Sequence, residues 1–329
     1  MGQLPRAAIR GTGAYVPSKV MTNADFEKVI DTSDEWIVQR TGIKERRVMG
    51  EGETTSSMAL AAARAALADA NVNAGDLDLI ICATVTGDMP FPATACFVQQ
   101  GLCITDIPVF DLSAACSGFL YALSVGSQFI QAGTYRKVLV IGVDALSRFT
   151  DYTDRGSCIL FGDAAGAVVL EPTFDDKGVL YSVLRAEGAG WDYINVPGGG
   201  TRYPASVQTL ADRLHYVKMK GRDVYKFAVE KMQWLLGDCM AQCGLTVETV
   251  DMVVPHQVNL RIIDSAAQKY GFPMEKIDIN IERYGNTSAA SIPLALDEAR
   301  RAGRIGPGSN IIMVAFGAGL TWAGAVVKL

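Results

Sequence analysis

Histidine is scarce in this chain: only His215 and His256 occur among its 329 residues. Long apolar runs are missing too, since none reaches the roughly 20 residues that cross a bilayer. The first residues lack the charged-then-apolar leader of a secretory signal. Basic residues are not in excess, because the net charge is −5, which argues against a nucleic-acid binder. We therefore expect a cytoplasmic protein that binds neither membranes nor nucleic acids.

Paired cysteines with metal-binding spacing are also lacking. The seven cysteines are odd in number and scattered, which is typical of reduced thiols in a cytosolic protein. Cys239 and Cys243 lie four residues apart and would share a helix face, as a zinc site can begin. No second pair at such spacing follows, so core packing is favoured. We expect no metal site.

The apolar content is instead arranged as a repeated α/β unit. The chain is 49% hydrophobic, and its length suggests about two units of ~150 residues. A helix over 56–70 precedes an apolar strand at 77–84, and a helix starting at Val224 precedes another at 250–254. Similar segments, 165–170 and 323–329, end both copies. We predict two halves, 1–175 and 176–329.

Continuous apolar strands indicate how these halves are layered. The runs at 138–142 and 311–315 have no polar alternation, which is typical of sheets covered by helices on both faces. Two such units predict a duplicated, five-layer α/β/α/β/α fold. The Gly- and Pro-containing stretch 188–213 is expected to be a long surface loop, either at a site mouth or merely solvated.

Cys116 is the first candidate catalytic residue. It follows the apolar run 107–110 and opens a helix of small and apolar residues. The free N–H groups and positive dipole end of such a helix favour a thiolate, the reactive form of cysteine. Taken alone, a buried structural cysteine is the more ordinary interpretation.

Two further candidates lie far downstream. His256 closes the apolar run 250–254, and a strand's carboxyl end is where open α/β sheets place their chemistry. An imidazole there can act as a base or hydrogen-bond donor, or can merely cap the next helix. Asn286 lies in a Gly-Asn-Thr-Ser stretch that alone indicates only a turn.

Taken together, these segments resemble the condensing enzymes of fatty-acid synthesis. The likeness is greatest to the 3-oxoacyl-acyl-carrier-protein synthase III family of the thiolase-like superfamily, and it covers essentially the whole chain. The matching segments are 31–37, 40–43, 115–116, 154–156, 161–166, 256–259, 285–291 and 316–322.

This resemblance implies a decarboxylating Claisen condensation. Cys116 would take the acyl group from a primer thioester, and the backbone N–H groups of Cys116 and Ala318 would form its oxyanion hole. Many relatives have glycine at the position of Ala318, so the backbone freedom of that loop is in question. His256 and Asn286 would stabilise the enolate left when malonyl loses CO₂. Two aromatic residues, Phe161 and Phe316, would keep the site apolar.

The resemblance also implies coenzyme A thioesters as substrates and no cofactor. Trp36 would stack on adenine, with Arg40 and Arg155 contacting the nucleotide and phosphates, and Asn259 would hold the pantetheine arm. From the residues alone, Trp36 would instead pack at the start of a helix capped by Thr32 with Glu35.

The expected partners are malonyl-acyl-carrier protein and a second copy of the chain. Lys226, Arg261 and Lys269 are candidate contacts for the acidic carrier protein, although charged helix residues are usually just solvated. The first half carries the larger insertion, at 87–100. By the family's pattern, Phe91 within it would reach the acyl pocket of the partner in a homodimer.

Rival interpretations are weaker. A papain-like protease shares the order Cys, His, Asn but needs a different sequence around the cysteine. A degradative thiolase would need a second cysteine near the C-terminal glycines, and none follows Cys243. A non-catalytic partner subunit would lack the nucleophile. The remaining alternative is a synthase-III-like acyltransferase or condensing enzyme of secondary metabolism. Primer length and branching stay open.

Overall fold

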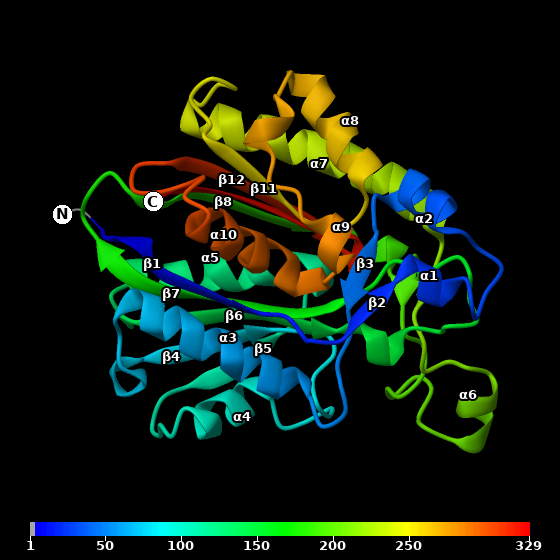
Figure 1. Cartoon of the computed structure of the whole chain (residues 1–329). Helices are drawn as coiled ribbons and strands as arrows, with labels where there is room; N and C mark the ends of the chain where they lie inside the picture. The colour runs from blue at the N-terminus through cyan, green and yellow to red at the C-terminus, as the bar shows by residue number, and fades with distance from the viewer. Residues whose placement is uncertain (1–3) are drawn as a thin grey trace.

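The computed structural model describes residues 4–329 and is built around two mixed β-sheets (Figure 1). The five-stranded sheet has the order β1 (Arg6–Tyr15), β7 (Asp163–Thr173), β6 (Val138–Ala145), β4 (Leu79–Ala83) and β5 (Val109–Leu112). The four-stranded sheet has the order β11 (Met252–Pro255), β12 (Asn310–Gly317), β13 (Thr321–Lys328) and β8 (Gly178–Ala186).

The two sheets repeat one topology. In the first, β7 runs antiparallel to both β1 and β6, and β4 runs parallel to β6 and β5. In the second, β13 is antiparallel to both β8 and β12, and β11 is parallel to β12. A parallel bridge between Val253 and Ile277 stands where β5 stands in the first sheet. The duplicated fold expected from the sequence is confirmed, while the boundary at 175 stays a prediction.

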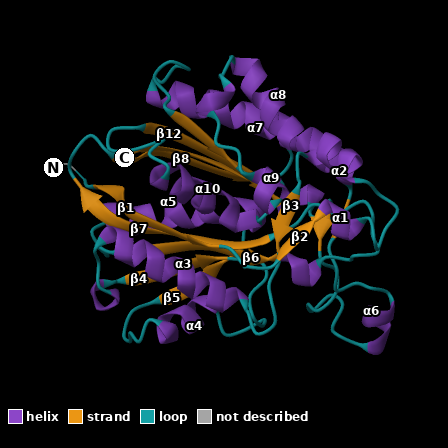
Figure 2. Ribbon diagram, viewed as in Figure 1, coloured by secondary structure: helices purple, strands orange, loops and turns teal. Residues whose placement is uncertain are grey.

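Helices fill the space between the sheets and cover their outer faces, giving the five layers (Figures 1 and 2). The central layer contains α5 (Gly118–Gln131) and α10 (Ser291–Arg301). The outer layers contain α3 (Thr55–Ala70) and α4 (Thr94–Gly101) on the first sheet, and α7 (Gly221–Cys243) and α8 (Leu260–Tyr270) on the second.

This layering explains why the strands are apolar without alternation. Along β4, Leu79 and Ile81 pack into the central core, whereas Ile80 and Cys82 pack beneath α3 and α4. Successive side chains point to opposite faces of a strand, so both faces of each sheet need apolar residues.

Short elements complete the chain. The remaining helices and strands are β2 (Val20–Thr22), α1 (Asn23–Phe26), α2 (Asp34–Thr41), β3 (Glu45–Arg47), β9 (Ile194–Asn195), α6 (Val207–Ala211), β10 (Lys218–Met219) and α9 (Ile281–Tyr284). Single 3₁₀ turns are η1 (Ala74–Asp76), η2 (Ala115–Ser117), η3 (Leu146–Phe149), η4 (Gly188–Gly190), η5 (Met274–Lys276), η6 (Ser288–Ala290) and η7 (Ala318–Leu320). Within residues 4–329, the longest apolar helical stretch falls short of a membrane span.

Two local expectations were wrong. The N-cap of α2 is Ser33, whose hydroxyl accepts from the Trp36 N–H, so Thr32 and Glu35 form no capping box. The stretch 188–213 is not one irregular loop, because it contains η4, β9 and α6, and β9 pairs with β10. The β9–β10 ribbon fixes the base of this excursion against the rest of the chain.

Glycines let the central helices approach the first sheet closely. Gly142 on β6 pairs with Gly166 on β7. A Cβ on Gly142 would lie 2.2 Å from the carbonyl oxygen of Ala289, and a Cβ on Gly166 would lie 2.7 Å from the backbone of Leu294. The sheet therefore meets the η6–α10 segment backbone against backbone.

We predict that Gly142→Ala lowers the free energy of unfolding by about 1–3 kcal/mol, because overpacking must push this contact apart. Urea unfolding followed by circular dichroism measures the loss. Gly75→Ala is the matched control, since its Cβ would meet no atom within 4 Å and should change stability by about 0.5 kcal/mol or less. Equal midpoints for the two variants would contradict the close-packing argument.

Candidate active site

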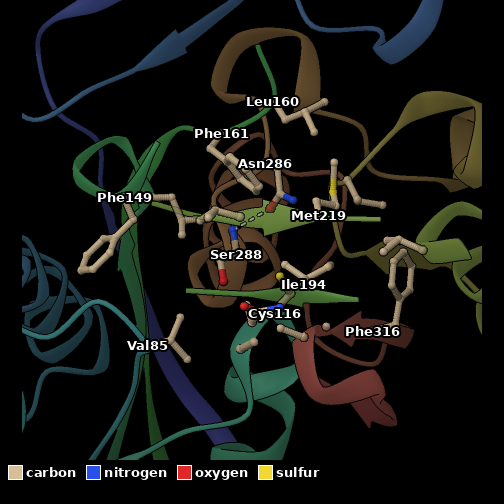
Figure 3. A pocket seen from close by; sticks show the side chains of 18 of the residues that line it. Val85, Cys116, Phe149, Leu160, Phe161, Ile194, Met219, Asn286, Ser288 and Phe316 are labelled. Carbon is tan, nitrogen blue, oxygen red and sulfur yellow. Dashed lines mark hydrogen bonds between the residues drawn. The ribbon is translucent and has the colours of Figure 1, made fainter. Parts of the chain in front are cut away.

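The ends of strands from both sheets meet at one apolar cavity of about 320 Å³ (Figure 3). Cys116 follows β5, His256 follows β11, and Ala318 follows β12. All three residues line the cavity, together with Asn286. Parallel strands bring their carboxyl ends to one edge of a sheet, which is why segments so distant in sequence converge here.

Cys116 is held on a strained turn at the start of α5. Its predecessor Ala115 has a φ of 47°, a left-handed conformation that costs energy for a residue with a side chain. Gly317, at the end of β12, lies close to Cys116: a Cβ there would lie 2.7 Å from the Cys116 nitrogen. Only glycine allows this approach, which sets Ala318 beside the cavity.

The expected thiolate is not favoured in this structure. Burial raises the pKa of the Cys116 thiol to about 12. Desolvation disfavours the charged form of the thiol. The raised pKa favours the protonated thiol at neutral pH.

His256 is a buried, neutral imidazole. Its side chain is 1% exposed and burial lowers its pKa to about 3. Neither ring nitrogen has a hydrogen-bond partner within residues 4–329, and the ring packs edge-on against Phe316 with centroids 5.6 Å apart. A neutral imidazole carries one donor and one acceptor, so His256 can offer an N–H to a ligand in the cavity.

Asn286 is fixed so that its amide group faces the same space. Its Oδ1 accepts from the Ser288 N–H at 2.9 Å, as the dashed line in Figure 3 shows. Its backbone bonds to Leu160 and Gly162 on either side of Phe161. Because Oδ1 is occupied by the turn, the Nδ2 group is the part of this side chain suited to donate to a ligand.

Ala318 causes no backbone strain. The positive φ angles of its loop belong to Gly319, at 75°, and Leu320, at 47°. Alanine is therefore compatible with position 318, because the neighbouring Gly319 adopts a left-handed conformation that the loop requires. The Thr321 hydroxyl donates to the Ala114 carbonyl at 3.0 Å, which ties this loop to the one carrying Cys116.

A cationic and aromatic cluster lies outside the cavity. Arg40 and Arg155 each place their guanidinium carbon 4.6 Å from the centre of the Trp36 ring. Asn259 caps α8 through Oδ1 and donates through Nδ2 to the Arg40 carbonyl at 2.9 Å. Its polar groups are thus engaged within the protein rather than free for a ligand.

The residues expected at interfaces lie on the surface. Phe91 is 82% exposed and does not line the cavity of its own chain. Lys226 and Arg261 are exposed near the starts of α7 and α8, but Lys269 is in the last turn of α8, over the Tyr270 ring. At 1.5 Å per residue, Lys269 lies about 12 Å along the helix from Arg261.

Apart from Phe161 and Phe316, which the resemblance places at the site, the sequence did not identify the apolar wall of the cavity. Six residues that line the cavity form a separate apolar cluster: Leu146, Phe149, Leu160, Phe161, Ile194 and Val217. They come from four distant segments, so no local pattern connects them. Asp144 was missed as well, although a lone carboxylate ending the apolar strand β6 is a readable signal.

Comparisons with known proteins agree with this geometry. Residues 110–188 match the family model of 3-oxoacyl-(acyl-carrier-protein) synthase III, and residues 240–329 match the model of its C-terminal part. The chain is 50% identical to the beta-ketoacyl-(acyl-carrier-protein) synthase III of Caldanaerobacter subterraneus, covering 98% of this chain and 97% of that protein. It is 51% identical to the enzyme of the same name from Symbiobacterium thermophilum, covering 97% of each.

Solved structures of condensing enzymes are also similar to this chain over nearly its whole length. The 3-oxoacyl-(acyl-carrier-protein) synthase III of Aquifex aeolicus has a TM-score of 0.91 at 45% identity, covering 98% of this chain and 100% of that chain. The priming β-ketosynthase of the R1128 polyketide pathway has a TM-score of 0.92 at 33% identity, covering 100% and 98%. This chain therefore belongs to the 3-oxoacyl-(acyl-carrier-protein) synthase III family of condensing enzymes.

Proposed function

We propose that this chain condenses an acyl-CoA primer with malonyl-acyl-carrier protein. The products are 3-oxoacyl-carrier protein, CO₂ and CoA, and the reaction initiates fatty-acid synthesis without a cofactor. One observation carries the proposal: Cys116, Asn286 and a neutral His256, whose ring nitrogens have no hydrogen-bond partner among residues 4–329, line a single apolar cavity.

In the first half-reaction, Cys116 takes the acyl group. Its sulfur attacks the thioester carbonyl, and the negative oxygen of the tetrahedral intermediate receives hydrogen bonds from the backbone N–H groups of Cys116 and Ala318. Collapse of this intermediate releases CoA. The glycine contact between Gly317 and Cys116 supports the pairing of these two donors.

In the second half-reaction, His256 and Asn286 stabilise the malonyl-derived enolate. Loss of CO₂ leaves negative charge on the thioester oxygen, and two neutral donors can hold that oxygen without protonating the carbon nucleophile. The low pKa of His256 supports this role, because the imidazole stays neutral at physiological pH. An apolar wall containing Phe161 and Phe316 disfavours the malonyl carboxylate relative to neutral CO₂.

Substrate recognition is assigned to the surface around the cavity. The cluster of Trp36, Arg40 and Arg155 suits a purine ring and its phosphates. Asn259 helps to position Arg40, because its Nδ2 group donates a hydrogen bond to the backbone carbonyl of Arg40. Lys226 and Arg261, with Lys269 further along α8, are proposed contacts for the acidic carrier protein. We also propose a homodimer in the cytoplasm, with the boundary between the two halves of each chain near residue 175.

Polyketide priming is the second candidate, because the R1128 enzyme shares 33% identity and the fold. Purified protein is offered acetyl-, isobutyryl- and octanoyl-CoA with malonyl-carrier protein, and products are identified by mass spectrometry. Short 3-oxoacyl products support fatty-acid initiation. Transfer of primers without loss of CO₂ would instead support an acyltransferase.

The two half-reactions should separate by mutation. His256→Ala should still become acylated at Cys116, seen as an increase in intact mass, yet decarboxylate malonyl-carrier protein ~10²–10³-fold more slowly, as expected for loss of one charge-stabilising donor. Cys116→Ala should not be acylated but should retain decarboxylation. Cys103→Ala, which removes an exposed cysteine, is the control and should do both. Loss of acylation in His256→Ala would make the histidine the obligatory base of the thiol.

Reversing the charge of Arg261 should weaken carrier-protein use. Arg261→Glu is expected to raise KM for malonyl-carrier protein about tenfold while sparing a small malonyl thioester, because rim charges change association more than chemistry. Arg136→Glu is the control, because it makes the same charge change at an exposed position before β6, away from the cavity. Equal losses with both substrates would remove Arg261 from the docking surface.

Phe91 should limit acyl length through the partner subunit. Phe91→Ala is expected to extend the accepted primer by two or more carbons, measured by competition among straight-chain acyl-CoAs of about 2–10 carbons, because removing the ring lengthens the pocket. Phe174→Ala, another exposed phenylalanine, is the control. An unchanged length profile, or a monomer in sedimentation, would contradict this role.

A further inference from the structure

Arg46 is a fully buried cation that the proposed mechanism does not use. It lies in β3, is 0% exposed and does not line the cavity. Burial lowers the pKa of its guanidinium to about 10, so the group still carries its charge at neutral pH. A buried charge is costly unless it is paired or well hydrogen bonded, and the groups that surround this one therefore show what it holds in place.

The guanidinium joins the β2–α1 segment to a segment far along the chain. Its Nη1 donates to the Met21 carbonyl at 3.2 Å and to Asn23 Oδ1 at 2.9 Å, and its Nη2 donates to the Ile159 carbonyl at 2.6 Å. Its carbon lies 4.5 Å from the centre of the Phe26 ring, whose face attracts a cation. These partners are all uncharged, and the forked shape of the guanidinium lets one side chain hold them together.

Ile159 begins the short segment that holds Asn286. The Asn286 N–H donates to the Leu160 carbonyl at 2.8 Å, and the Gly162 N–H donates to the Asn286 carbonyl at 2.9 Å. These two bonds form a parallel bridge between Phe161 and Asn286, and both side chains lie together at the cavity in Figure 3. A shift of this segment would therefore carry the Asn286 backbone with it.

The stem of Arg46 packs behind both members of this pair. A Cβ on Gly162 would lie 3.2 Å from the Arg46 Cβ, and a Cβ on Gly285 would lie 3.4 Å from it. Each glycine is the sequence neighbour of a residue that lines the cavity, Phe161 or Asn286. Arg46 therefore supports the bridged pair from the side away from the cavity.

We infer that Arg46 positions Asn286 for stabilisation of the enolate. This inference rests on the proposed role of Asn286 in decarboxylation. The guanidinium fixes the Ile159 carbonyl, the residues after Ile159 hold the Asn286 backbone, and the arginine stem limits movement of that backbone away from the cavity. Because Arg46 does not line the cavity, it is a positioning residue and acts through Asn286.

The two half-reactions distinguish this role from general structural support. Arg46→Met removes the hydrogen bonds and keeps much of the stem, so CO₂ release from malonyl-carrier protein should slow by about 10²-fold, as for a misplaced catalytic group. Acylation of Cys116 at saturating acetyl-CoA should change by less than about threefold, because Asn286 is not used in that transition state. A general loss of structure would slow both steps.

A double-mutant cycle tests whether Arg46 acts through Asn286. Asn286→Ala alone should slow CO₂ release by about 10²–10³-fold, the effect of losing one charge-stabilising donor. Adding Arg46→Met should then cost less than about threefold more, because two residues that serve one interaction are not additive. An independent structural role of Arg46 would instead give the product of the two losses.

Lys276 provides a matched control. Its Nζ donates to the carbonyls of Val247, Glu248 and Val250 at 2.8, 3.0 and 2.7 Å, and it lies outside the cavity lining. Lys276→Met removes as many hydrogen bonds from a cation and should change both rates by less than about threefold. Arg46→Lys keeps the charge but not the fork, so it should restore CO₂ release only in part.

CO₂ release and the intact mass of the acylated protein are measured at pH 7, with thermal unfolding of every variant. Wild-type CO₂ release by Arg46→Met, equal losses in both half-reactions, or additive losses in the cycle would overturn the inference. If Arg46→Met does not fold, the cycle is run with Arg46→Lys, and no loss or an additive loss overturns it. Wild-type CO₂ release by Asn286→Ala would refute the proposed role of Asn286 instead.

Discussion

The close approach of backbones at the carboxyl ends of the strands is the constraint on which the rest of the structure depends. Gly317 brings β12 of one half against Cys116 of the other, and Gly142 brings β6 against Ala289. Side chains at either position would push the nucleophile, the glycine loop and the Asn286 turn apart. The cavity exists because two similar sheets meet with almost no side-chain spacer between these segments.

Desolvation controls the pKa values of the buried ionisable groups at and beside the cavity. It keeps His256 neutral and the Cys116 thiol protonated, and it raises the pKa of Asp144. All three effects disfavour charge before substrate arrives. An acyl transfer and a decarboxylation both create negative oxygen briefly, and fixed neutral donors in a dry cavity stabilise such charge more strongly than water-exposed ones.

Of the seven non-glycine residues with positive φ within residues 4–329, three border the cavity. Ala115, Ser288 and Leu320 all have φ near 50° without being glycine, and all three line the cavity. Each follows or precedes a proposed functional residue by no more than two positions. Such conformations survive only when surrounding packing holds them.

The sequence by itself determined the class of fold and the identities of the main chemical groups. Unbroken apolar strands require covered sheets, and the repeated endings at 165–170 and 323–329 reveal the duplication, because these are local patterns. Only the tertiary structure decided the direction of the Cys116 pKa shift, since burial by distant segments raises it. It also decided the cavity wall, because the residues of that wall come from segments that no sequence spacing connects.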